Sequence, residues 1–335
     1  MSVKKVAPMG FQFYVLDPYI IAMHHRDLFP KGNGKMGPIE MPLGKNNGND
    51  FDMNASWRMY HGNTISGFPV HPHRGFETVT VMVEGFADHF DSKGSKGRYG
   101  QGDVQWMTAG AGVQHSEMFP MLKDDTENPM ELFQIWLNLP KKNKFANPDY
   151  KMFWSEDIPT VTEKGVEVKI IAGEYKGVKS LDPLPDSWAY DRDNHVGIWI
   201  ITLQPNAEMT IPAVSSTLNR VLYNYEGGGV IDIDGNKVEK RYYAELEGDK
   251  DILIVNGEEA TKLLLLEGEP INEPLVSYGP FVMNNQAEIK QALLDYQKTQ
   301  FGGWPWERED PVNTKEQERF ASYNNGERVE YPNKK

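Results

Sequence analysis

Short apolar runs bounded by glycine, proline or asparagine recur along most of the chain, and nearly all of them are too short for a helix. In the first half they cover residues 78–83, a run that ends at Thr108, and residues 131–139; in the second half they cover residues 166–172, 196–203, 218–225, 229–233, 251–255 and 262–267. Runs of this length between turn residues are typical of β-strands. The pattern therefore predicts an all-β protein.

Two turn signals refine this prediction. Asp234-Gly235 lies between two strand-like segments and is a strong signal for a two-residue hairpin. Residues 11–23 contain two apolar runs separated by Asp17-Pro18, which predicts a strand, a turn and a second strand.

One segment near the C-terminus has helical periodicity instead. Asn285 followed by Glu288 resembles a helix cap, and apolar residues then recur with the spacing of one helix face, at Ile289, Ala292, Leu293 and Tyr296. Gly302-Gly303 is expected to end this helix. From residue 307 onward the chain is mostly polar, and we expect a surface arm there.

Composition narrows the class of protein. The chain has 335 residues, enough for two domains, and its 31 glycines and 22 prolines suit a fold with many turns. The formal net charge is −13, from 35 basic and 48 acidic residues, which argues against direct binding of nucleic acid.

The absence of certain sequence features bears on localisation. The chain has no cysteine, so disulfides and thiolate metal sites are excluded and a reducing compartment is favoured. No run approaches the about 18 apolar residues of a membrane span, and polar residues interrupt the N-terminal segment where a signal peptide needs an apolar core. These features predict a cytoplasmic protein without a membrane partner.

Two pairs of potential metal ligands flank the first strand-like runs. Alternate residues of a strand share a face, so His71 and His73 point the same way, as do His115 and Glu117. Turn signals between the pairs allow them to meet on neighbouring strands. Three imidazoles and one carboxylate suit one divalent ion such as iron, nickel, copper, manganese or zinc.

The residues around these pairs resemble the pirin family of the cupin superfamily. The resemblance rests on HPHRGFETV from residue 71, on GDVQWMTAG followed by HSEM up to residue 118, and on YGPFVMN at residues 278–284. It implies a bicupin of two antiparallel β-barrels of the jelly-roll type, followed by a helix and a tail. It also implies one mononuclear site, usually Fe(II), held by His71, His73, His115 and Glu117.

Proline-containing turns place the linker between the two barrels near residues 140–165. Residues 1–150 would form a metal-binding cupin barrel, residues 151–282 a second barrel, and residues 283–335 the helix and a surface tail. Because His195 is the only histidine of the second half and has no HxH partner, we expect the second barrel to be metal-free.

The loop-rich segment at residues 24–67 is longer than the corresponding part of other pirins and is interpreted as an insertion of unassigned role, with one strand expected at residues 55–61. His24, His25 and His61 lie in it. We expect these histidines to be structural or exposed.

Glu77 is an alternative ligand, since the general cupin pattern places a glutamate soon after HxH. By simple strand alternation Glu77 shares the face of the histidines, yet it lies about 13 Å beyond His73 along a straight strand at ~3.3 Å per residue. It could coordinate only if the chain turned at Arg74-Gly75. The pirin pattern favours Glu117 as the ligand and leaves Glu77 as a buried supporting carboxylate.

The resemblance leaves two functions open. In the first, the metal centre is a dioxygenase that opens a flavonol such as quercetin with O₂, releasing carbon monoxide, and Glu117 is both metal ligand and base. In the second, the protein is an iron-dependent redox-sensing regulator, a transcription cofactor or enzyme modulator that acts by contact with a protein partner. A third reading, a cupin that acts on some other small substrate, is also open because cupin folds carry many chemistries.

Overall fold

The computed structural model describes residues 2–41, 52 and 54–333. The chain is mostly β-strand, as predicted, and divides into two compact units. Unit 1 comprises Met1–Ala22, Trp136–Asn138 and Asp157–Asn272; unit 2 comprises Met23–Ile135, Leu139–Glu156 and Glu273–Lys335. These units do not follow the continuous ranges expected from the sequence, because segments from both ends of the chain pair with strands far away in the sequence.

Unit 1 is built from two antiparallel sheets that share an apolar core. The described strands of the larger sheet are, in spatial order, β1 (Val3–Pro8), β20 (Tyr242–Leu246), β17 (Asn219–Gly227), β22 (Thr261–Gly268), β15 (Gly197–Leu203), β12 (Val166–Ala172) and β11 (Thr160–Glu163). The smaller sheet consists of β16 (Glu208–Ile211), β21 (Ile252–Val255), β18 (Ile231–Ile233) and β19 (Asn236–Val238), and β13 (Glu174–Tyr175) pairs with β14 (Val178–Lys179). Apolar residues of both sheets form one buried cluster, which is the packing of a cupin-type fold.

The hairpin predicted at Asp234-Gly235 is confirmed. It joins β18 to β19, and both of its central residues have positive φ, at 48° and 86°. This conformation is what a two-residue turn between antiparallel strands requires.

Unit 2 has the same two-layer construction. One sheet contains β10 (Asp149–Phe153), β7 (Val104–Thr108), β4 (Phe76–Glu84) and the larger parts of β9 (Asn128–Asn138) and β2 (Tyr19–Phe29). The other contains β26 (Arg328–Glu330), β25 (Phe320–Tyr323), β6 (Lys96–Gly100), β5 (Phe86–Asp91), β8 (Val113–Phe119) and β3 (Ser66–His73). Residues from both sheets form a second buried cluster, so the space between the sheets is the core of this unit.

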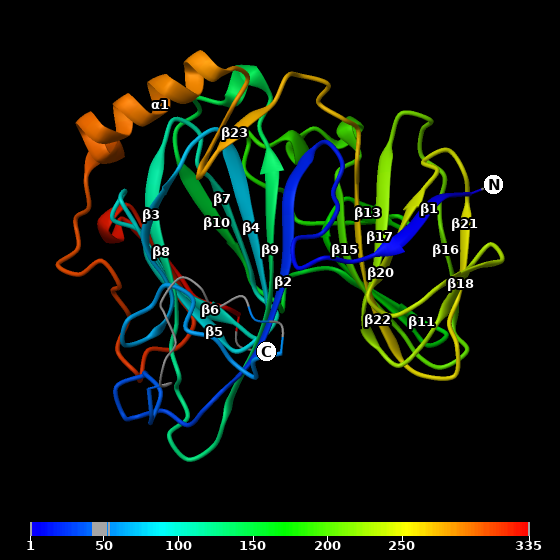
Figure 1. The fold of residues 1–335 in the computed structure, drawn as a ribbon, viewed down its shortest axis with the longest axis horizontal. Helices are drawn as coiled ribbons and strands as arrows, with labels where there is room; N and C mark the ends of the chain where they lie inside the picture. The colour runs from blue at the N-terminus through cyan, green and yellow to red at the C-terminus, as the bar shows by residue number, and fades with distance from the viewer. Residues whose placement is uncertain (1, 42–51, 53, 334–335) are drawn as a thin grey trace. The chain divides into compact units, whose positions relative to one another are not determined.

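The predicted helix is α1 (Gln286–Thr299), drawn in orange in Figure 1. The side chain of Asn285 accepts a hydrogen bond from the backbone N–H of Glu288 and caps it. Ile289 and Ala292 pack on the strand pair β23 (Val276–Tyr278) and β24 (Phe281–Met283). Short 3₁₀ turns are present at Lys141–Asn143, Trp188–Tyr190, Arg192–Asn194, Gln300–Gly302 and Asn324–Gly326. Within the described part of the chain, no helix has the length and apolar character needed to cross a membrane.

The expectation of a surface arm after residue 307 is wrong for the described tail. Residues 320–323 form the buried strand β25, which pairs with β6 in the sheet of unit 2. Arg98 of β6 donates hydrogen bonds to the backbone oxygens of Thr314 and Gln317, at 3.0 and 2.8 Å. A tail rich in polar residues is therefore fixed by backbone hydrogen bonds, which its composition does not reveal.

The segment before β3 also differs from its prediction. The expected strand at residues 55–61 is absent, and Tyr60 has a φ of 53°, which interrupts an extended backbone. Of the two strands expected in residues 11–23, only the second forms, as the start of β2. Residues 42–51 and 53 of the loop-rich segment lie outside the described residues.

Candidate metal centre

The two HxH and HxE segments lie on paired strands. β3 and β8 run antiparallel, with His71 opposite His115 and His73 opposite Val113. Potential ligand atoms of His71, His73 and His115 all lie within 4.8 Å of one another. Figure 1 shows these two strands side by side in unit 2. The structure therefore brings together the three histidines that the sequence selected.

Local backbone features fix this arrangement. The β3–β8 register shifts between Phe68 and His71, so a bulge precedes the first histidine. Gly67 has a φ of 139°, and a Cβ there would lie 2.4 Å from the backbone oxygen of Glu117. A residue with a side chain would force β3 away from β8. Glycine at this position is thus required for the close approach of the two strands.

The chain leaves β3 through Arg74, which is anchored on three sides. Its Nε donates to the backbone oxygen of Ala111 at 2.6 Å, its Nη1 pairs with Asp295 of α1 at 2.7 Å, and its guanidinium lies over the ring of Phe301. Helix α1 and the segment that follows it therefore support the end of the strand that carries His71 and His73.

The imidazoles have the surroundings of metal ligands. His71 Nδ1 lies 2.8 Å from the backbone oxygen of Pro69, to which it donates when Nε2 is left as the coordinating atom. Among the described residues, neither ring nitrogen of His115 has a hydrogen-bond partner, although both are buried. Burial lowers the pKa of His71 to about 4 and places the pKa values of His73 and His115 well below their usual range. Clustered imidazoles that stay neutral, together with the two unpartnered nitrogens of His115, fit a divalent metal ion.

Glu117 lies next to this cluster. One of its carboxylate oxygens is 3.8 Å from His115 Nε2. Gln134 donates to the same oxygen at 3.3 Å, whereas the hydroxyl groups of Thr80 and Tyr99 lie 3.0 and 3.4 Å from the other oxygen. Burial raises the pKa of Glu117, and these hydrogen bonds act in the opposite direction. The carboxylate is therefore held in place while remaining a stronger base than an exposed glutamate.

Glu77 lies away from the histidine cluster, so the prediction that it shares the face of the histidines was wrong. Gly75 has a φ of 86°, so the chain bends between β3 and β4 and the count of alternate residues restarts. Within β4, Thr80 faces Glu117, so Glu77 projects from the opposite face of the strand. There it accepts a hydrogen bond from Thr108 at 2.6 Å. Glu77 is buried but separated from the histidine cluster by its own sheet.

Sequence reasoning missed a fourth histidine near the cluster. His89 on β5 is opposite Glu117 on β8, and Asp91 is opposite His115. The rings of His89 and His115 are 5.6 Å apart between centroids. His89 is a lone histidine in its strand and shows no spacing motif. Only the pairing of β5 with β8 places it beside the site.

As expected, the histidines of the loop-rich segment are structural or exposed: His24 and His25 make buried contacts, and His61 is exposed. His25 Nδ1 lies 2.9 Å from the hydroxyl of Tyr60, which in turn donates to Asp27. His24 lies 3.0 Å from Glu131 within the same unit.

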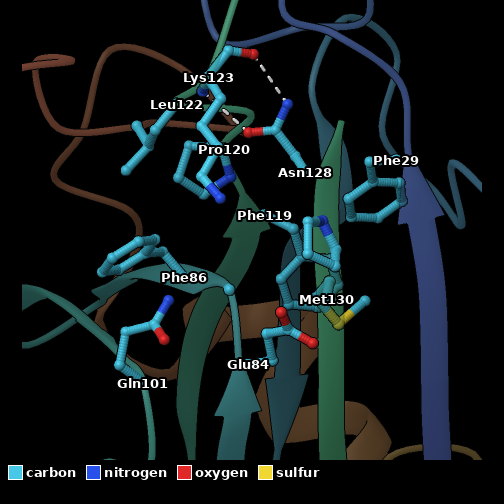
Figure 2. Close-up of a pocket in the computed structure, with 12 residues that line it drawn as sticks. Phe29, Glu84, Phe86, Gln101, Phe119, Pro120, Leu122, Lys123, Asn128 and Met130 are labelled. Atoms are coloured by element: carbon cyan, nitrogen blue, oxygen red, sulfur yellow. Dashed lines mark hydrogen bonds between the residues drawn. The ribbon is translucent and has the colours of Figure 1, made fainter. Parts of the chain in front are cut away.

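A separate pocket of unit 2 is shown in Figure 2. It lies near the ends of strands, between Phe29, Phe119 and Met130, and Asn128 and Lys123 hydrogen-bond to each other at its rim. Its volume is about 40 Å³, far below the roughly 300 Å³ or more of a typical ligand pocket. The described residues that line it do not include the clustered histidines, so it is not the candidate centre.

Two cupin-type units, one of which brings together three histidines, two of them fully buried, beside a glutamate, define a cupin protein with a candidate metal site. The model of the family described as Pirin matches residues 46–137, and that described as Pirin C-terminal cupin domain matches residues 198–302. The chain is 42% identical to Pirin-1 of Arabidopsis thaliana over 71% of this chain and 79% of that protein, and 36% identical to Pirin of Homo sapiens over 72% and 80%. The chain therefore belongs to the pirin family.

A solved structure is also similar. The crystal structure of a quercetin 2,3-dioxygenase from Acinetobacter baumannii matches with a TM-score of 0.70 and 28% identity, over 90% of this chain and 98% of that chain. The predicted fold class and family resemblance are thus confirmed.

The depressed histidine pKa values predict loss of stability in acid. The unfolded chain takes up protons on these histidines near pH 6.5, whereas folded His71 does so only near pH 4, so stability falls as the pH decreases between these values. His73, His115 and also His25, whose pKa is lowered to about 3, act in the same direction. The raised pKa values of several buried carboxyl groups oppose this trend, namely those of Glu117, Asp27, Asp103, Asp149 and Glu267. Carboxyl groups start from ordinary pKa values near 4, so the histidines dominate the upper part of the pH range.

We expect the free energy of unfolding of metal-free protein to decrease from pH 7 to pH 5, by at most about 1.4 kcal/mol per pH unit for each histidine. Urea titrations at a series of pH values measure this. A flat profile would contradict the burial of neutral histidines.

Proposed function

We propose that this protein is a mononuclear dioxygenase that opens the heterocyclic ring of a flavonol such as quercetin. The proposed metal ligands are His71, His73, His115 and Glu117, with Fe(II) as the ion and one ion per chain, and with unit 1 free of metal. The observation that carries the proposal is the histidine cluster with a hydrogen-bonded glutamate 3.8 Å from it. The likeness to a quercetin 2,3-dioxygenase over most of both chains supports it.

A bound divalent metal would supply open coordination positions for a chelating substrate and for dioxygen. The residues of this chain perform the remaining tasks. The sheets of unit 2 bury His73, His115 and Glu117 and leave His71 partly exposed. Glu117 accepts the proton of the flavonol 3-hydroxyl. Gln134 and Tyr99 hold the carboxylate oriented during this transfer.

The overall reaction is balanced with dioxygen as the oxidant. Both atoms of O₂ enter the products, the heterocyclic ring is cleaved, and one ring carbon leaves as carbon monoxide. The proton accepted by Glu117 returns to the carboxylate product, so the enzyme is unchanged after one cycle.

The assay uses protein purified without chelators. Metal analysis should give close to one equivalent per chain, and addition of quercetin under air should abolish the flavonol absorbance band and release carbon monoxide. Two equivalents, both lost slowly to chelator, would indicate a second site in unit 1. Fully iron-loaded protein that consumes quercetin no faster than metal-free protein would exclude the dioxygenase.

The regulatory alternative rests on the net charge of −13, which suits contact with a basic protein and not with DNA. It becomes the better hypothesis if iron is bound and no flavonol is consumed. In either case, the absence of cysteine supports the proposal that the protein works in the cytoplasm.

The pair Glu117→Gln and Glu77→Gln tests the assignment of the ligand and base. Glu117→Gln should change the spectroscopic signature of the bound metal and lower the turnover of quercetin by about 100-fold or more, the scale of a lost general base. Glu77→Gln makes the same chemical change on the far face of β4 and should affect only stability. If Glu77→Gln alters the coordination and Glu117→Gln does not, the proposed site is wrong.

A further inference from the structure

The interior of unit 2 contains a buried amide without a partner close to Glu117. Gln105 of β7 is 1% exposed, and among the described residues neither its Oε1 nor its Nε2 has a hydrogen-bond partner. A buried amide without partners has lost the hydrogen bonds that it made with water, so such residues usually have a reason to persist.

Strand pairing places this amide at the candidate centre. Gln105 is directly opposite Thr80 of β4, and the Thr80 hydroxyl lies 3.0 Å from a carboxylate oxygen of Glu117. Directly opposite residues share a face, with their Cβ atoms about 5 Å apart. Gln105 therefore projects into the space between the two sheets, one neighbour away from Glu117.

A second buried group approaches Glu117 from the other sheet. His89 of β5 is fully buried and directly opposite Glu117, with its Nε2 3.3 Å from Asp91. Asp91 is held by the backbone N–H groups of Lys93 and Ser95. Its carboxylate can accept a hydrogen bond from His89 Nε2, which directs Nδ1 away from Asp91. That Nδ1 has no hydrogen-bond partner in the described part of the chain.

A third polar group lies on the same face. Thr78 precedes Thr80 by two residues, so both project to the same side of β4. Its hydroxyl is buried and has no partner among the described residues. The two sheets thus present an amide, an imidazole nitrogen and a hydroxyl to the interior beside the cluster.

We propose that Gln105 and His89 form a recognition site for the hydroxyl groups of a polyhydroxylated aromatic chelator, in addition to the oxygens that bind the metal. His89 Nδ1 forms a hydrogen bond with one hydroxyl, and the Gln105 amide can both donate and accept. A site built to hydrogen-bond a substrate hydroxyl discriminates against an analogue that lacks it, because its own buried groups then stay unpaired. This inference rests on the proposed function for the class of ligand, but it concerns binding and not turnover.

Two ligands test the proposal. Quercetin carries hydroxyls on both ring systems, whereas 3-hydroxyflavone carries only the chelating hydroxyl and carbonyl. We measure the Kd of each for iron-loaded protein under nitrogen, in wild type and in the variants Gln105→Met and His89→Phe. The preference for quercetin is the Kd of 3-hydroxyflavone divided by the Kd of quercetin. It should fall by about 3- to 10-fold from wild type to each variant, which corresponds to the loss of one hydrogen bond, while the Kd of 3-hydroxyflavone stays unchanged. Gln101→Met makes the same chemical change at an exposed position and should preserve the preference.

Metal content and thermal unfolding separate recognition from a structural role. Both variants should retain a full metal equivalent. Metal-free Gln105→Met should be at least as stable as wild type, because methionine fills a similar volume without an unpaired amide. Lower metal content, equal weakening of both ligands, or a lower Tm for Gln105→Met would overturn the proposal. If wild type binds quercetin selectively but does not consume it with oxygen, only the proposed dioxygenase activity is refuted. If wild type consumes quercetin and both variants keep its preference for quercetin over 3-hydroxyflavone, only the recognition site is refuted.

Discussion

His115→Ala should leave a folded protein that no longer retains metal. The His115 ring belongs to the central strand of the site, opposite His71, and lies 4.4 and 4.9 Å between centroids from the rings of His71 and His73. Its removal takes away one proposed ligand. Loss of a residue that only supports a ligand weakens metal binding by up to about 100-fold, so loss of the ligand itself should weaken it by more. Because neither of its nitrogens forms a hydrogen bond in the described structure, no polar partner is left unsatisfied and the chain should still unfold cooperatively.

The measurement is metal per chain after dialysis, together with a urea unfolding curve of the metal-free protein. His195→Ala is the matched control, since that histidine lies in unit 1 with its side chain 45% exposed. It should keep the wild-type metal content. A full metal equivalent in His115→Ala would remove this cluster from consideration.

Arg98→Met should destabilise unit 2 by about 3–5 kcal/mol, the cost of removing one partner of a buried ion pair. Arg98 is fully buried and binds Asp88 through two hydrogen bonds of 2.6 and 2.7 Å. The same side chain donates to the backbone oxygens of Thr314 and Gln317. Loss of the guanidinium therefore leaves Asp88 buried without its cation and releases the segment that leads into β25.

Urea unfolding measures the loss of stability, and limited proteolysis detects cleavage near residues 313–319. The double variant Arg98→Met with Asp88→Leu should recover part of the stability, because it no longer buries an isolated carboxylate. It should not restore protection of the tail, which depends on hydrogen bonds from the arginine. A proteolysis pattern like that of wild type in both variants would show that the tail is held by other contacts.

The metal cluster could be predicted from sequence because its information is local. Residues two apart on a strand share a face whatever the fold, so HxH and HxE each define a pair of side chains. The helix was predictable for a similar reason, since its cap and its apolar face lie within a single segment. The spacing of each pair does not show that His71 lies opposite His115, because this depends on how the two strands pair. The family resemblance supplied that information by implying that both pairs hold one metal ion.

Features that depend on pairing between distant strands could not be predicted. His89 and Gln105 show no motif, and they approach Glu117 only through the β5–β8 and β4–β7 registers. Glu77 was misplaced because a single positive φ at Gly75 shifts the alternation of every residue after it. The polar tail was taken for an exposed arm because four residues, at 320–323, carry too little hydrophobic pattern to identify a buried strand.

The pairing of β25 with β6 has a consequence for protein synthesis. The histidine-bearing strands β3 and β8, together with β5 and β6, leave the ribosome well before residue 320 is made. Until then β6 presents a row of unpaired backbone N–H and C=O groups along one edge. A growing chain at this stage already contains its proposed ligands but has an unprotected strand, so it is the form of this protein most open to β-pairing with a neighbouring nascent chain.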